Sequence, residues 1–270
     1  MHRVAVPLLC ISCSAALQPP RAGLPCTGPV SCGREQLVEA DQALQHAVLQ
    51  SGVAQAFADV LLEDAKLLGE GQGLISGRAP VLDALRGARP FAWTLARADV
   101  SGNAELGYSF GWTPKGHYAA VWRRKGGEWK LAVFLRKAAE AQDAAPPAWF
   151  MPFRGEREPA PRAAHTVSAT DTAFAALAKR SGTQVAFTAY AAQDAVQLAR
   201  TMIFGRDAIH RLFDGAPAIE WGPVAEDAAQ DLGYTIGAYA LGASRGNYLT
   251  IWRLEPDGSW RYVLDGGVKG

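Results

Sequence analysis

The chain has 270 residues, of which 49% are hydrophobic and 20% are charged, and its formal net charge is +1. This is the composition of a globular protein with room for two domains. The basic residues are scattered, and no apolar run is long enough to cross a bilayer. The sequence therefore argues against a nucleic-acid-binding protein and against a membrane-spanning one.

Residues 1–16 predict a signal peptide. The apolar stretch VAVPLLCISCSAAL follows one firm positive charge, and Ser14-Ala-Ala16 fits a cleavage site. We therefore expect a periplasmic or secreted protein. The sequence Ile11-Ser-Cys13 also resembles part of a bacterial lipoprotein box, so a lipid anchor at Cys13 is the weaker alternative.

Residues 17–34 are expected to form an N-terminal tail. The tail contains Cys26 and Cys32, which in an exported protein could close a small disulfide loop or could stay free. Two cysteines without a histidine nearby do not make a zinc site. We therefore expect a tail that is either closed by a disulfide or free, and no metal site.

Most of the remaining chain is a tandem duplication. At an offset of about 130 residues Asp41 meets Asp171, and "ELGYSFG" in the first half returns as "DLGYTIG" in the second. The duplication predicts copy one (35–137), an Ala- and Pro-rich linker (138–166) and copy two (167–268).

Each copy has the same order of predicted elements. An amphipathic helix comes first, with Leu37, Leu44 and Val48 at helical spacing in copy one. A Ser-Gly break, a second helix and a short third helix follow. Four strands close the copy, with the alternation typical of strands in "NYLTIWRL". The sequence thus predicts an α+β fold with two similar halves.

The pattern EDA, G-R, LGY, G-Y, W-R and W-K resembles the nuclear transport factor 2-like superfamily. Within it, the chain is most similar to SnoaL-like and ketosteroid-isomerase-like domains of unassigned function. The resemblance implies two cone-shaped domains, each with three helices on a strongly bent, mainly antiparallel sheet around an apolar pocket. Such sheets often pair back to back in homodimers, so the tandem chain is expected to be a monomer with an internal pseudo-dimer.

Gly242-x-Ser244-x-Gly246 matches the nucleophile-elbow motif of serine hydrolases. That motif requires a strand before the serine and a helix after it. Here a strand is predicted on both sides, and copy one has Thr113-Pro-Lys-Gly116 at the same place. A hairpin loop is therefore expected instead of a nucleophile.

A catalytic carboxylate is the next possibility. The resemblance implies a general base about five residues beyond an Asp-Ala pair, and those positions hold Gly69 and Ala199. The base is thus absent from both copies. Glu70 is one residue late, and Asp265 stands on the last strand of copy two where copy one has Phe134. These two carboxylates are the weak catalytic candidates.

Four other charges predict structural ion pairs. Asp64 and Asp194 are expected at the end of the second helices, and Arg78 and Arg206 at the start of the third helices. Each charge is unfavourable with respect to its helix dipole. We therefore expect the pairs Asp64–Arg78 and Asp194–Arg206 to tie the two helices together.

Aromatic residues recur on the predicted strands. They either line a pocket for a flat apolar ligand or fill the core. Because only copy two has a carboxylate on its last strand, a functional pocket is expected there. The candidate ligand-binding residues are Trp221, Tyr234, Tyr248, Trp252 and Asp265.

Two functions remain open. The histidines follow no metal-binding pattern, so neither a metal nor a cofactor is expected. Because the implied base is missing, we favour a non-catalytic binding or accessory protein for a small apolar ligand. The alternative is an isomerase-, cyclase- or dehydratase-like enzyme that transfers protons on such a ligand.

Overall fold

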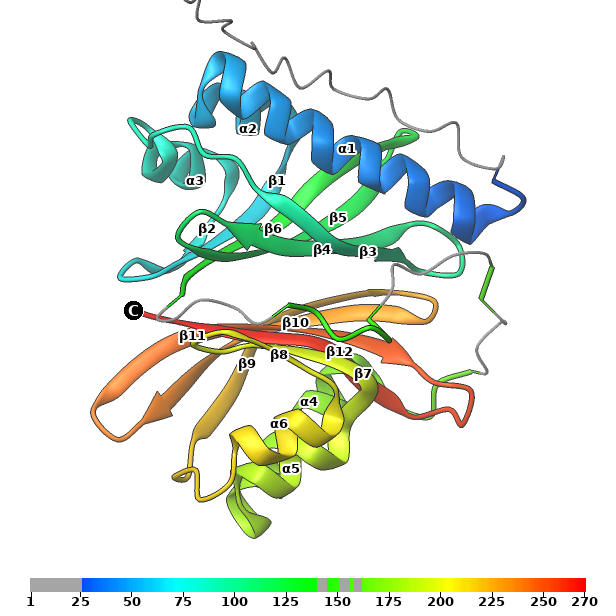
Figure 1. Ribbon diagram of the computed structural model, residues 1–270, viewed down its shortest axis with the longest axis vertical. Coiled ribbons are helices and arrows are strands. Elements are labelled where there is room, and N and C mark those ends of the chain that lie inside the picture. Colours follow the sequence, from blue (N-terminus) through cyan, green and yellow to red (C-terminus); the bar gives the residue numbers. More distant parts are fainter. Residues whose placement is uncertain (1–25, 140–144, 151–155, 158–161) are drawn as a thin grey trace, which may run out of the picture.

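The structure, a computed structural model, describes residues 26–139, 145–150, 156–157 and 162–270 (Figure 1). Residues 1–16 and Cys13, on which the predictions of export and lipid anchoring depend, lie outside this part of the chain. None of the helices in the described ranges has the length and apolarity needed to span a membrane.

The two halves have the same element order. In the first half the elements are α1 (Pro29–Ser51), α2 (Val53–Val60), β1 (Leu61–Gly69), β2 (Gly73–Ser76), α3 (Arg78–Leu85), β3 (Thr94–Val100), β4 (Leu106–Thr113), β5 (Gly116–Lys125) and β6 (Glu128–Ala138). In the second half they are α4 (Val167–Ser181), α5 (Thr183–Tyr190), β7 (Ala191–Leu198), β8 (Met202–Phe204), α6 (Arg206–Leu212), β9 (Glu220–Ala229), β10 (Leu232–Leu241), β11 (Ser244–Leu254) and β12 (Trp260–Lys269).

The break between the first two helices of each half lies at a glycine. Gly52 has a φ of 88° and Gly182 a φ of 97°, a region that residues with a Cβ rarely adopt. Helix α1 buries Leu37, Leu44 and Val48, the predicted apolar stripe. It begins at Pro29, so it extends into the segment predicted to be a tail.

Each half has one six-stranded sheet, with strand orders β2-β1-β6-β5-β4-β3 and β8-β7-β12-β11-β10-β9. Only the pairs β1–β6 and β12–β7 are parallel within these sheets. The predicted α+β architecture, with mainly antiparallel sheets and three helices each, is confirmed. The prediction of four strands per copy was too low, because β1 and β2 in the first half and β7 and β8 in the second were not predicted. Strands β1 and β7 follow α2 and α5 directly, where a longer helix was expected.

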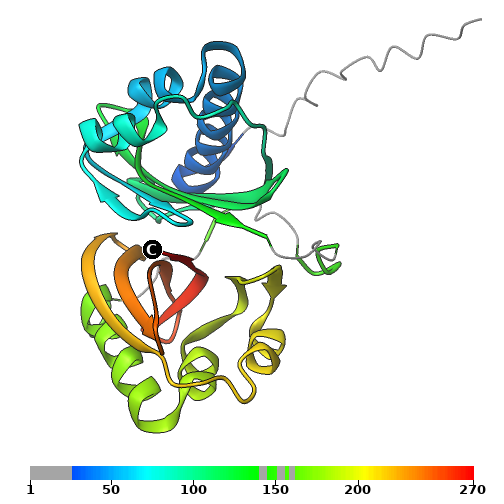
Figure 2. The same ribbon diagram turned by 90° about the vertical axis from the view of Figure 1, so that its left-hand side faces the viewer.

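The two sheets pack face to face, and the helices cover their outer faces (Figure 1 and Figure 2). Strand alternation decides which side chains meet there. On β4, Tyr108 and Phe110 join the apolar cluster shared with the second half, whereas Gly107 faces α1. A Cβ at Gly107 would lie 2.6 Å from the Leu37 side chain, so the helix can approach this closely only because the residue is glycine.

Ion pairs and the linker also join the halves. Arg97 of β3, almost fully buried, donates to Asp194 of β7 at 2.8 Å, and Arg123 of β5 binds Asp227 of β9. From the linker, Phe150 is buried against Phe110 and Phe204. The two sheets therefore share one apolar and ionic interface.

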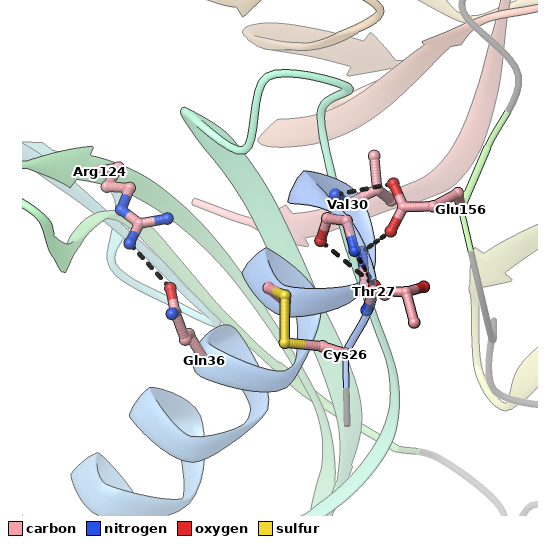
Figure 3. Close-up of a disulfide and its surroundings, with 9 residues drawn as sticks. Cys26, Thr27, Val30, Gln36, Arg124 and Glu156 are labelled. Atoms are coloured by element: carbon pink, nitrogen blue, oxygen red, sulfur yellow. Dashed lines mark hydrogen bonds between the residues drawn. A yellow bond between two sulfur atoms is a disulfide. The ribbon is translucent and has the colours of Figure 1, made fainter. Parts of the chain in front are cut away.

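The start of α1 is held by two further contacts (Figure 3). A disulfide joins Cys26 to Cys32. The carboxylate of Glu156, from the linker, accepts hydrogen bonds from the backbone N–H groups of Val30 (3.1 Å) and Ser31 (2.8 Å). An anion is favourable at a helix N-terminus, so the linker caps the first helix.

Candidate functional site

Asp41 of α1 is a carboxylate buried inside the first cone. Its oxygens accept hydrogen bonds from Trp93 Nε1 at 2.8 Å, Ser109 Oγ at 2.6 Å and Tyr118 Oη at 3.1 Å. Burial raises the pKa of the Asp41 carboxyl, and the three hydrogen bonds act in the opposite direction. With three donors around it, Asp41 is a satisfied core residue.

Asp171 of α4 takes the same place in the second cone but has fewer donors. Tyr248 Oη donates to it at 2.6 Å, and a hydrogen bond with the Thr235 side chain also lowers its pKa. Trp221 does not reach it, since its ring packs edge-on against Phe174 and Phe187. Burial raises the pKa of Asp171 to about 6, with a further rise from the negative charge of Asp265. Copy two therefore holds a carboxyl that can change its charge near neutral pH.

Asp265 is another buried carboxyl of copy two, and strand pairing supplies its partners. It is 8% exposed and lies between Gln197 of β7 and Thr250 of β11, opposite both in the sheet register. The Gln197 amide and the Thr250 hydroxyl each donate to one of its oxygens at 2.5 Å. Burial raises the pKa of Asp265, whereas these hydrogen bonds and the charge of Lys137 lower it.

Copy one is apolar at the same three positions. Phe134 of β6 pairs with Leu67 of β1 and Ala120 of β5, in the register that Asp265 shares with Gln197 and Thr250. Three neighbouring side chains on three strands thus change from apolar to polar between the copies. The difference between the copies is a polar cluster and not one isolated residue.

Each cone contains a cavity. The cavity of copy one has a volume of about 330 Å³, with apolar walls and a rim that includes Glu70 and Lys115. The cavity of copy two has a volume of about 430 Å³. Next to it lies a chamber of about 10 Å³, room for one water-sized group. The chamber is lined by Asp171, Phe174, Phe187, Trp221, Tyr248, Thr250, Trp252, Tyr262 and Asp265.

The structure brings four of the five candidate ligand-binding residues together. Trp221, Tyr248, Trp252 and Asp265 all line the chamber of copy two. Tyr234 lies on the opposite face of β10, in the cluster between the sheets, because side chains of a strand alternate between faces. It has no place in this cavity.

The other motif predictions can be located as well. Glu70 lies at the rim of the copy-one cavity, in the turn between β1 and β2, and is exposed. Gly69 and Ala199 line the cavities of their copies, and neither supplies a carboxylate. Ser244 begins β11 opposite Leu241 in a tight hairpin, with Gly242 at a φ of 57°. The hairpin predicted for this motif is therefore confirmed.

The two predicted ion pairs are wrong. Asp64 and Asp194 lie in strands β1 and β7, and not at helix ends. Asp194 binds Arg253 at 2.9 Å and Arg97 at 2.8 Å. Burial raises its pKa, but the charges and hydrogen bonds of these arginines outweigh burial, so the net shift is downward.

The arginines still tie the helices together, but through backbone oxygens. Arg206 donates twice to the carbonyl of Ala191, which caps α5, at 2.7 and 2.9 Å. Arg78 donates to the carbonyl of Ala58 in the last turn of α2 at 2.6 Å, and pairs with Glu63 at 3.1 Å. A cation at a helix C-terminus satisfies free carbonyls and the dipole.

Sequence reasoning missed Asp171, Gln197 and Thr250. A signal for Asp171 was present: with Asp41 it recurs on the apolar stripe of the first helix in both copies. Gln197 had no such signal, because its strand was not predicted. Within the described ranges, no three His, Cys, Asp or Glu side chains are placed to hold a metal ion.

No family model matches the chain, and no curated protein sequence matches it. Among solved structures, part of the chain is similar to a ketosteroid isomerase-like protein from Erwinia carotovora atroseptica, with 16% identity and a TM-score of 0.34 over 38% of this chain and 92% of that chain. An NTF-2 like protein of unknown function from Shewanella oneidensis gives 15% identity and a TM-score of 0.32 over 37% and 95% of the two chains. An NTF2-like protein with a cystatin-like fold from Novosphingobium aromaticivorans is 19% identical, with a TM-score of 0.30 over 38% of this chain and 79% of that chain. Identities this low carry no conclusion about function.

Proposed function

We propose that the chain is an exported, monomeric protein that binds a small apolar molecule in the cone of copy two and does not catalyse a reaction. The observation that carries this proposal is the cavity of about 430 Å³. Its walls combine apolar side chains, such as Leu198, Leu212 and Phe213, with a few polar groups, as is typical of ligand sites.

Two features support export. The apolar stretch near the N-terminus has the features of a signal peptide, and the disulfide between Cys26 and Cys32 is of a kind that persists in oxidising compartments. Fractionation of cells that express the tagged chain tests this part: the processed protein is expected outside the cytoplasm. The shared interface between the sheets supports the monomer, and a solution mass of two chains would contradict it.

A matched pair of cavity-filling variants tests the site. Ala216 lines the copy-two cavity, and its counterpart Ala88 lines the copy-one cavity. Tryptophan at either position fills space without adding charge. We expect Ala216→Trp to weaken binding of a neutral naphthyl dye about tenfold, because most of its apolar contacts are lost, whereas Ala88→Trp leaves it unchanged. The dye is followed by fluorescence titration.

The reverse pattern, with loss of binding only in Ala88→Trp, would move the site to copy one. If the wild-type chain binds no apolar dye, the proposed function fails.

Proton transfer is the second candidate function, favoured by one observation. Asp171 and Asp265 line the same chamber, and the pKa of Asp171 is raised to about 6, a range suited to general acid or base work. An enzyme of this kind would exchange deuterium into a bound enolisable ketone, and Asp265→Asn would abolish the exchange. Absence of exchange in a complex that does form would exclude this candidate.

A further inference from the structure

The polar groups of the copy-two site are mainly hydrogen-bond acceptors. Two carboxyl groups, Asp171 and Asp265, line one chamber. The protein supplies them with donors from Tyr248, Thr235, Thr250 and Gln197. None of the residues that line the chamber is cationic. A buried acidic pair without a cation in its chamber is unfavourable when both groups are ionised.

An independent observation points to a missing donor. Gln197 is 6% exposed and lines the larger cavity, and its Oε1 is buried without a hydrogen-bond partner among the described residues. The amide nitrogen of Gln197 donates to Asp265, so the amide oxygen is the end that has no partner. A buried acceptor of this kind is costly unless something donates to it. Gln197 lies in the wall of the cavity of about 430 Å³, next to Asp265 in the sheet.

The walls of the chamber suit a cation. Six aromatic rings surround the two carboxyl groups, and ring faces attract positive charge. They belong to Phe174, Phe187, Trp221, Tyr248, Trp252 and Tyr262.

The size of the chamber selects the kind of cation. About 10 Å³ accommodates a group the size of a water molecule, which fits a primary ammonium and excludes a trimethylated one. The neighbouring cavity of about 430 Å³ shares Phe187, Trp221, Tyr248 and Asp265 with the chamber. A molecule can therefore place its head where the chamber meets the cavity and its body in the cavity.

We propose that copy two binds an apolar molecule with a primary ammonium group, which lies at the junction of the two cavities, between Asp171, Asp265 and the free carbonyl oxygen of Gln197. The inference rests on the proposed ligand-binding function and adds the chemical class of the ligand. An ammonium group has three donors, one for each of these acceptors. Charge-assisted hydrogen bonds to carboxylates are stronger than those between neutral groups.

The charged and titratable groups around the site set the expected pH dependence. Lys137 lines the larger cavity with Asp265 and lowers the pKa of that carboxyl, and Glu226 raises the pKa of Asp171 from outside the chamber. Tyr248 and Tyr262 keep raised pKa values and stay neutral. The pKa values of both aspartates are raised in the free protein. Affinity for an ammonium ion should therefore be full above about pH 7 and fall as the pH drops through about 6.

Three probes with one apolar body test the head group: phenylbutylamine, phenylbutanol and phenylbutanoate, measured by calorimetry on the full chain. At about pH 8 the amine is expected to bind about tenfold more tightly than the alcohol, and the acid most weakly. Lowering the pH to about 5 should reduce amine affinity about tenfold and leave alcohol affinity unchanged. This series needs no variant.

Asp265→Asn is expected to lower amine affinity about tenfold without affecting the alcohol. Gln197→Leu, the residue that copy one has at this position, should weaken the amine selectively as well. Glu39→Gln removes one exposed negative charge from α1 and serves as the control, with no change expected.

Equal affinity for amine and alcohol, or preference for the acid, would overturn the ammonium assignment and leave the binding function in place if Ala216→Trp still weakens the neutral dye. Binding of the dye with none of the three probes would also overturn it. Absence of both dye and probe binding would remove the proposed function itself.

Discussion

Copy one and copy two have the same helices and strands but differ in the side chains that fill their interiors. In copy one Asp41 is surrounded by three donors, and Phe134 packs against Leu67 and Ala120. In copy two the corresponding Asp171 has lost its tryptophan donor, and Asp265 introduces a second carboxyl. One backbone register thus supports a satisfied core in one half and an acceptor-rich cavity in the other. The comparison teaches that an added charge needs several compensating substitutions on neighbouring strands.

The largest expected effect comes from introducing the charge alone. Phe134→Asp removes a buried ring and places a carboxyl between Leu67 and Ala120, neither of which can donate to it. We expect the free energy of unfolding to fall by about 5 kcal/mol in chemical denaturation. Adding Leu67→Gln and Ala120→Thr should restore about 2 kcal/mol, because it recreates the donors of copy two. No recovery in this triple variant would contradict the cluster interpretation.

The first-helix aspartates form the next matched pair. Asp41→Ala leaves the donors of Trp93, Ser109 and Tyr118 without their acceptor, so a loss of about 4 kcal/mol in unfolding free energy is expected. Asp171→Ala leaves fewer donors without an acceptor, so the unfolding free energy should fall by about 2 kcal/mol. Equal losses would show that the two interiors are satisfied to the same degree.

The pH dependence of stability sharpens the same comparison. The pKa of Asp171 is raised from 3.8 in its ordinary state to about 6 in the fold. The folded state therefore holds a proton that the unfolded state releases, so this contribution is fully present below about pH 4 and is lost as the pH rises through about 6. The shift corresponds to a contribution on the order of 3 kcal/mol. Denaturation curves at a series of pH values should show this slope in the wild-type chain and a flatter one in Asp171→Asn, with Asp194→Asn giving no such flattening.

The smallest expected effects concern the starts of α1 and α4. The first is stapled by the disulfide between Cys26 and Cys32, while the second relies on Thr166, whose side chain accepts a hydrogen bond from the N–H of Ala169 at 3.1 Å. Loss of the short disulfide loop should cost about 2 kcal/mol at most. Thr166→Ala should cost about 1 kcal/mol in thermal unfolding. A larger effect in Thr166→Ala than in the double variant Cys26→Ser, Cys32→Ser would reverse this order.

The sequence predicted much of the fold because duplication repeats each local signal. The helical spacing of Leu37, Leu44 and Val48 recurs in the second half, and so does the glycine at which the first helix ends. Strands β1 and β7 were missed because their apolar residues continue directly from those of α2 and α5, and periodicity alone does not separate a short strand from a helix end. The ion-pair predictions failed for the same reason: a strand points Asp194 towards the other sheet instead of towards Arg206.

By itself, the sequence determined the two copies, the α+β class, the hairpin at Ser244 and the difference between Asp265 in copy two and Phe134 in copy one. These follow from local periodicity, turn chemistry and alignment of one half on the other. Only the tertiary structure decided what surrounds Asp265. Its donors come from Gln197, 68 residues earlier, and Thr250, 15 residues earlier, and the sheet register alone brings these strands together. Long-range pairing of this kind leaves no local trace in the sequence, because each polar residue is unremarkable until its neighbours in the sheet are known.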